Sequence, residues 1–103
     1  MNKYGLHGIL KAKKSKGDEM ASILLDASKL VGKAKGCSLY IVSRDSQNPD
    51  NIWVTEVWDT KGDHDNSLKD PSVRDLISKA MPLLGSTPEV GQELLILGGH
   101  GLE

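Results

Sequence analysis

Three histidines and one glutamate are the side chains in this sequence best suited to moving a proton. The histidines are His7, His64 and His100, and imidazole is the group that titrates nearest to neutral pH. His7 lies in the middle of a predicted strand, where it is either a ligand-facing base or, more simply, a packed or partner-facing residue. Glu56 shares a strand face with Trp58, where a carboxylate is costly to bury alone. We therefore expect Glu56 at the rim of a cavity or inside one.

The two tryptophans are expected to face opposite sides of one strand. Trp53 and Trp58 stand five residues apart, and successive strand side chains alternate between faces. One should meet helices or a pocket, and the other a subunit interface. Because the chain has no Phe and only two Tyr, these rings must fill much of any ligand cavity, unless both serve only as core.

Several common chemistries lack their sequence patterns. No histidine or cysteine pair has metal-ligand spacing, so no metal site is expected. Phosphate-binding glycine loops and the G-x-S-x-G nucleophile motif are also missing. The single cysteine, Cys37, excludes an internal disulfide and is interpreted as a small core residue rather than a nucleophile.

Composition and charge argue against nucleic acid and membrane partners. The chain has 103 residues and a net charge of −1, and its 13 basic residues are 11 Lys and 2 Arg. A duplex-binding domain usually carries a basic excess with arginines for bidentate contacts. The lysine run at 11–16 has no interleaved aromatic residues and is interpreted as a solvated strand exit. No apolar run approaches 18 residues and no leader is recognisable, so a cytoplasmic location is expected.

Hydrophobic periodicity predicts an α+β sandwich of one domain, residues 1–98, with a tail at 99–103. Leu102-Glu103 is interpreted as a cloning remnant. Ser15 or Asp18 is the expected N-cap of the first helix, and Pro82 is expected to shorten the last. A capping box of Thr60 and Asp63 is expected to begin the second helix, and Asp70 as N-cap with Pro71 the third. The predicted order is β-α-β-β-α-α-β, an antiparallel sheet with helices on one face. Strands are expected at residues 4–13, 37–44, 52–59 and 89–97. Helices are expected at residues 18–34, from residue 60 and from residue 71.

The other sheet face needs a partner. The 52–59 strand is apolar on both faces, with Ile52, Val54 and Trp58 on one side and Trp53 and Val57 on the other. The helices cover only one face, so a homodimer through the open sheet face is predicted.

Three segments together resemble a known family. They are Gly36-Cys37-Ser38-Leu39-Tyr40 before a polar turn, Glu56-Val57-Trp58-Asp59, and Leu68-Lys69-Asp70-Pro71. This arrangement is similar to the antibiotic biosynthesis monooxygenase domain family, and the likeness in element order runs from about residue 4 to residue 97. Its members are ferredoxin-like proteins that dimerise through their sheets into a dimeric α/β barrel.

The resemblance implies a cofactor-independent monooxygenase that oxidises a quinol or polyphenol-like small molecule with O2, using neither flavin nor metal. A deprotonated quinol passes an electron to oxygen directly, so the protein must bind it, desolvate it and remove a proton. By position, Trp58 and Tyr40 would line the cavity. His64 would handle the proton, with His7 and Glu56 in reserve.

Departures from the family keep two alternatives open. Many quinol-oxidising relatives carry His where this chain has Ser67 and Ser72, which favours a non-catalytic small-molecule binding or sensing module of the same fold. The haem-degrading branch uses Asn, Trp and a haem-ligating His at about the positions of Leu10, Ser67 and Ile77. Haem degradation is therefore the third interpretation.

Overall fold

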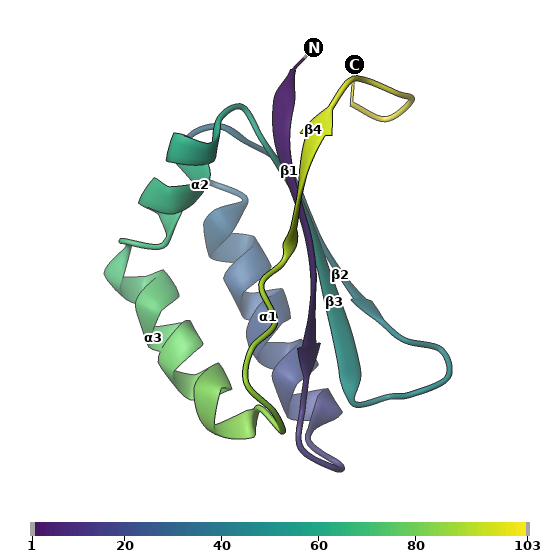
Figure 1. Ribbon diagram of the computed structural model, residues 1–103. Coiled ribbons are helices and arrows are strands. Elements are labelled where there is room, and N and C mark those ends of the chain that lie inside the picture. Colours follow the sequence, from purple (N-terminus) through teal and green to yellow (C-terminus); the bar gives the residue numbers. More distant parts are fainter. Residues whose placement is uncertain (1, 103) are drawn as a thin grey trace.

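The computed structural model describes residues 2–102 and contains a four-stranded antiparallel sheet covered on one face by helices (Figure 1). Glu103, half of the suspected cloning remnant, lies outside the described residues. The sheet order is β2-β3-β1-β4, which confirms the predicted α+β ferredoxin-like sandwich. No helix in residues 2–102 is both long and apolar enough to cross a membrane. The elements are β1 (Lys3–Lys11), α1 (Gly17–Val31), β2 (Cys37–Arg44), β3 (Asn51–Trp58), α2 (Lys61–Ser67), α3 (Pro71–Ala80), the 3-10 turn η1 (Met81–Leu83) and β4 (Gln92–Ile96).

The core lies between the sheet and α1. Strand alternation sends Ile52, Val54 and Trp58 of β3 toward the helices, where Ile52 and Trp58 are completely buried. Met20 and Leu24 of α1 pack against Ile52 and Val54. Trp53 belongs to the opposite face, as its sequence spacing predicted.

The start of α1 differs from the expectation. Neither Ser15 nor Asp18 caps the helix, and the N-cap residue Lys16 makes no side-chain cap. Instead, Asp50 in the β2–β3 turn accepts hydrogen bonds from the backbone N–H groups of Ser15 (3.1 Å) and Gly17 (3.0 Å). A residue distant in sequence thus satisfies the donors at this helix terminus, which local patterns do not reveal.

Helices α2 and α3 begin where their capping residues predicted. The Thr60 hydroxyl accepts from the Asp63 N–H at 3.1 Å, and Asp70 accepts from the Ser72 N–H at 2.8 Å. Helix α3 ends at Ala80, and Pro82 lies in the η1 turn that follows. β4 begins at Gln92 rather than Glu89, because residues 84–91 form a strap that runs back beside β1 (Figure 1).

Candidate functional site

A cavity of about 160 Å³ lies between the helical layer and the sheet. Aliphatic side chains make most of its wall, the largest share from α1 and α3, and four polar side chains interrupt that wall. The polar residues are Tyr40 of β2, Glu56 of β3, and His64 and Ser67 of α2. An apolar enclosure with a few convergent polar groups is the usual form of a small-molecule site.

Glu56 and His64 form a buried acid–imidazole pair in this wall. Glu56 Oε1 accepts a hydrogen bond from Trp58 Nε1 at 3.0 Å and lies 3.8 Å from His64 Nε2. The Glu56 and His64 side chains are only 12% and 11% exposed. Burial raises the pKa of Glu56, and the Trp58 hydrogen bond and nearby His64 act in the opposite direction. The pair therefore places a proton-exchanging group beside apolar space.

His64 is held from several sides. Its Nδ1 is 3.0 Å from Asp65 Oδ1, and its ring meets Trp58 edge-on at a centroid distance of 5.8 Å. The Tyr4 ring lies 5.6 Å away. In addition, the Ser67 hydroxyl donates to the His64 carbonyl oxygen at 2.6 Å, within the last turn of α2. These contacts fix the imidazole orientation against the sheet.

Tyr4 connects this cluster to the edge strand. Its hydroxyl donates to Glu93 Oε2 of β4 at 2.9 Å, and Glu93 also pairs with Lys61 of α2 at 3.1 Å. Burial and the hydrogen bond to Glu93 raise the pKa of Tyr4 to about 12. Tyr4 therefore stays protonated at neutral pH and serves as a hydrogen-bond donor.

Tyr40 joins the first cavity to a second one of about 230 Å³. The second cavity lies under the strap, against Pro88 and Gly91, and shares part of its wall with the first. Burial, followed by the nearby Glu56, raises the pKa of Tyr40. Together the cavities fall at the lower end of the roughly 300–1,000 Å³ typical of small-molecule pockets. The shared residues are Leu10, Leu24, Tyr40 and Glu56.

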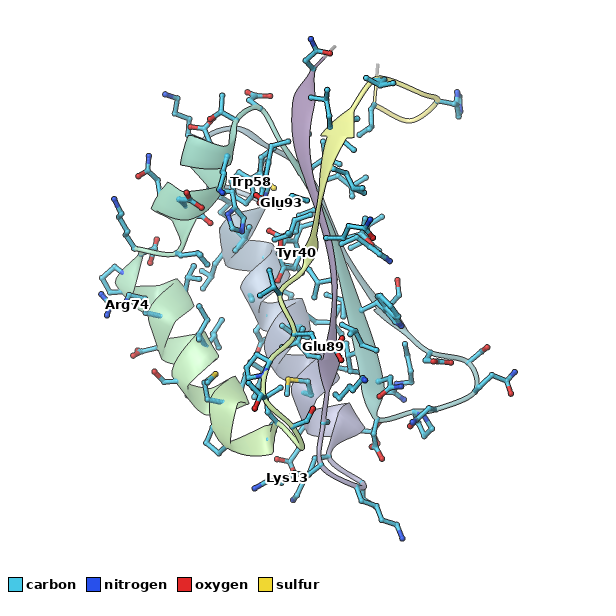
Figure 2. The ribbon with its side chains drawn as sticks, viewed as in Figure 1. Lys13, Tyr40, Trp58, Arg74, Glu89 and Glu93 are labelled. Atoms are coloured by element: carbon cyan, nitrogen blue, oxygen red, sulfur yellow. The ribbon has the colours of Figure 1, made fainter. Side chains whose placement is uncertain are left out.

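The structure brings three of the five predicted site residues to the cavity wall: Tyr40, Glu56 and His64. Trp58 stands behind that wall, fully buried, and contacts Glu56 and His64. Figure 2 shows Trp58 beside α2 and Tyr40 farther along the sheet, both between the sheet and the helices.

His7 is the predicted residue that does not join this group. It belongs to the open face of the sheet, where its ring stacks on Trp53 with a centroid distance of 4.8 Å. Its Nδ1 also lies 2.9 Å from the Thr55 hydroxyl. The sheet thus separates His7 from the cavity of its own chain.

Asp65, Tyr4 and Glu93 contribute to the site but were not recognised in the sequence. Adjacency to His64 was the available signal for Asp65. Tyr4 and Glu93 come from opposite ends of the chain and meet only through the pairing of β1 with β4. Across residues 2–102, no three His, Cys, Asp or Glu side chains gather as a metal site.

Fold and cavity define a class of protein: a ferredoxin-like α+β sandwich with an acid–imidazole pair in a cavity between sheet and helices. The sequence profile of the antibiotic biosynthesis monooxygenase family matches residues 4–79. The chain belongs to this family.

Solved structures agree with the assignment. A Chloroflexus aurantiacus J-10-fl protein, provisionally described as an antibiotic biosynthesis monooxygenase, is 37% identical with a TM-score of 0.87, over 98% of this chain and 99% of that one. A Caulobacter crescentus CB15 protein with the same provisional description shares the fold at 18% identity and a TM-score of 0.84, over 94% and 92% of the two chains. A Nitrosomonas europaea protein of unknown function shares the fold at 21% identity and a TM-score of 0.79, over 96% of this chain and 93% of that one. No curated protein matches the chain.

Proposed function

We propose that this chain is a cofactor-independent monooxygenase that oxidises a quinol or polyphenol-like small molecule with O2. The observation that carries the proposal is the Glu56–His64 pair in the wall of an otherwise apolar cavity, 3.8 Å apart and almost excluded from water. The aliphatic wall suits an aromatic ring, and the pair suits the removal of its hydroxyl proton.

In this mechanism, His64 Nε2 takes the proton from a substrate hydroxyl, and the resulting phenolate reduces O2 by one electron. The two radicals combine to form a C–O bond, and the ring peroxide that results takes the proton from His64 and becomes a hydroperoxide. His64 then removes the hydrogen from the same ring carbon as the O–O bond breaks. It gives that proton to the departing hydroxide, which leaves as water, and a hydroxyquinone remains. One quinol and one O2 thus yield one hydroxyquinone and one water, and the quinol supplies every electron.

The remaining cavity groups bind and shield the substrate. The Tyr40 hydroxyl stays protonated, because burial raises its pKa, and can donate a hydrogen bond to the substrate. Glu56, held by the Trp58 N–H, faces the imidazole and stabilises the positive charge that forms on it. Closure by α1 and α3 excludes water from the reacting ring.

The test is oxygen uptake by chelator-treated protein with a panel of hydroquinones. His64→Ala is expected to lower turnover by about 10²- to 10⁴-fold, the usual contribution of a general base. His100→Ala, a histidine in the tail, is the matched control and is expected to leave turnover unchanged. Unchanged turnover in His64→Ala, or loss in His7→Ala alone, would contradict the assignment of the base.

A non-catalytic binding or sensing module is the second candidate. Ser67 lines the cavity. The family resemblance implies a histidine at this position in many quinol-oxidising relatives, and its replacement by serine favours binding without catalysis. The outcome that supports this candidate is a hydroquinone that binds, by calorimetry, and is recovered unaltered under air. Haem degradation ranks third, because Leu10, Ser67 and Ile77 bring no imidazole to the wall that they line. Its test is a Soret shift on addition of haemin.

We also propose that two copies pair through the open sheet face. On that face Ile41 and Leu94 are 48% and 42% exposed, and Trp53 and His7 stack beside them. Contiguous apolar surface of this kind marks an interface in a small protein. A two-fold pair would cover both faces at once.

A further inference from the structure

We infer that Asp65 is a positioning residue for His64, holding the ring proton on Nδ1 so that an unprotonated Nε2 faces Glu56 and the cavity. The inference deepens the proposed function and rests on it for the role of His64. It starts from one contact, the 3.0 Å approach of His64 Nδ1 to Asp65 Oδ1.

The chemistry of the two groups determines the tautomer. A carboxylate only accepts hydrogen bonds, so the ring nitrogen bonded to Asp65 must carry a hydrogen. A neutral imidazole has a single N–H, so Nε2 is left with its lone pair. Nε2 is the atom that lies 3.8 Å from Glu56 Oε1. The proton acceptor and the cavity are therefore on the same side of the ring.

The two carboxyl groups that flank the ring differ in how far they are buried. The Glu56 side chain is 12% exposed, whereas that of Asp65 is 53% exposed and reaches solvent. Asp65 lines neither of the two cavities, so it acts on the substrate only through the imidazole. When Nε2 gains a proton, the imidazolium lies between both carboxyl groups, and its charge is balanced from each side.

The other elements around His64 offer no competing acceptor for Nδ1. β1 contributes Tyr4 and β3 contributes Trp58, and both approach with their rings. The hydroxyl of Tyr4 is directed to Glu93, which is also paired with Lys61. Glu56 approaches Nε2. Asp65 is thus the group placed to choose the tautomer.

The proton moves only between the substrate and His64 Nε2, and Asp65 takes up no proton. The substrate O–H bond breaks as an Nε2–H bond forms, and the Nδ1–H bond to Asp65 persists. The Nε2 proton later leaves with the hydroxide as water. Asp65 therefore sets the direction of the base and stabilises its charged form, the arrangement in which a base is oriented by a third group.

The test compares Asp65→Asn with the wild type by nitrogen-15 NMR of the His64 ring and by oxygen uptake. The wild type is expected to show the Nδ1–H form, and the variant a mixture with more Nε2–H. Turnover should fall at least about 10-fold with KM little changed. The loss should be smaller than the roughly 10⁴-fold seen for the buried aspartate of a serine-protease triad, because Asp65 is half exposed.

Three further variants make the result decisive. Asp75→Asn removes the same charge from α3, beyond the cavity, and is expected to change neither readout. Asp65→Glu is expected to recover part of the Nδ1–H population and part of the turnover. Because an asparagine oxygen can still accept from Nδ1, Asp65→Ala is measured as well, and a tautomer unchanged in both variants would overturn the inference, whatever happens to turnover. If the wild type consumes no oxygen, the proposed function fails, and the tautomer comparison still decides the role of Asp65.

Discussion

The Glu56 side chain in the cavity wall links the stability of the fold to pH. Its carboxyl group is buried beside a tryptophan N–H and an imidazole, and burial raises its pKa above the ordinary value of 4.5. The folded protein therefore holds this proton more tightly than the unfolded chain does. Stability from this group is present below about pH 4.5 and is lost as the pH rises through the folded pKa.

Glu56→Gln is expected to remove that pH dependence. The glutamine oxygen still accepts from Trp58 Nε1, but the amide at position 56 does not titrate. The variant should therefore gain stability relative to the wild type as the pH rises above 4.5. Urea denaturation at pH 4 to 8 measures the difference in the free energy of unfolding. A difference that stays constant over this range would contradict the buried, pKa-raised carboxyl. The proposed mechanism also predicts that oxygen uptake falls in this variant, because the imidazolium loses a counter-charge.

At the scale of elements, the β2–β3 turn organises the start of α1. Asp50 accepts from the Ser15 and Gly17 N–H groups, and Gly17 approaches Pro49 and Asp50 so closely that a Cβ would collide with their backbone. This contact ties the helix that forms one cavity wall to the hairpin that carries Tyr40 and Glu56. The turn therefore controls the spacing between the two layers.

Asp50→Ala is expected to cost about 1–2 kcal/mol of unfolding free energy, the usual loss of a helix-capping side chain. Asp50→Asn should lose about half as much, because its single amide oxygen can keep only one of the two hydrogen bonds that Oδ1 and Oδ2 of Asp50 accept. Urea denaturation of both variants with matched far-ultraviolet circular dichroism makes the comparison. Equal losses would mean that the negative charge, rather than the cap, is what matters.

For the whole molecule, the main open question is what covers the apolar side chains on the open face of the sheet. The helices cover one face of the sheet (Figure 1). The strand register places Ile41, Leu94 and Trp53 on the other face. In the proposed homodimer, a charge placed there would be buried without a partner, which costs several kcal/mol.

Ile41→Glu is accordingly expected to weaken self-association by at least about 100-fold. Leu25→Glu is the control, since Leu25 on α1 is 50% exposed against 48% for Ile41 but lies on the helical side. Sedimentation equilibrium over a concentration series distinguishes them. A wild type that is monomeric at tens of micromolar, or equal effects of both variants, would argue against pairing through the sheet.

Much of the architecture was readable from the sequence alone because it depends on local patterns. Alternation along β3 assigned Trp53 and Trp58 to opposite faces, and Asp70-Pro71 marked the start of α3. Element order and family membership also followed from the chain, and both are confirmed. These features repeat at periods of 2 or 3.6 residues, or depend on neighbours three positions away.

The tertiary structure alone decided what meets across the fold. It capped α1 with Asp50, made residues 84–91 a strap ahead of β4, and brought Tyr4 to Glu93. It also separated His7 from His64 by the thickness of the sheet, and placed the His64 ring between a buried and an exposed carboxyl group. The contacts of Asp50 with Gly17 and of Tyr4 with Glu93 join residues tens of positions apart. They depend on strand pairing and on how helices pack against the sheet, which no single stretch of sequence specifies.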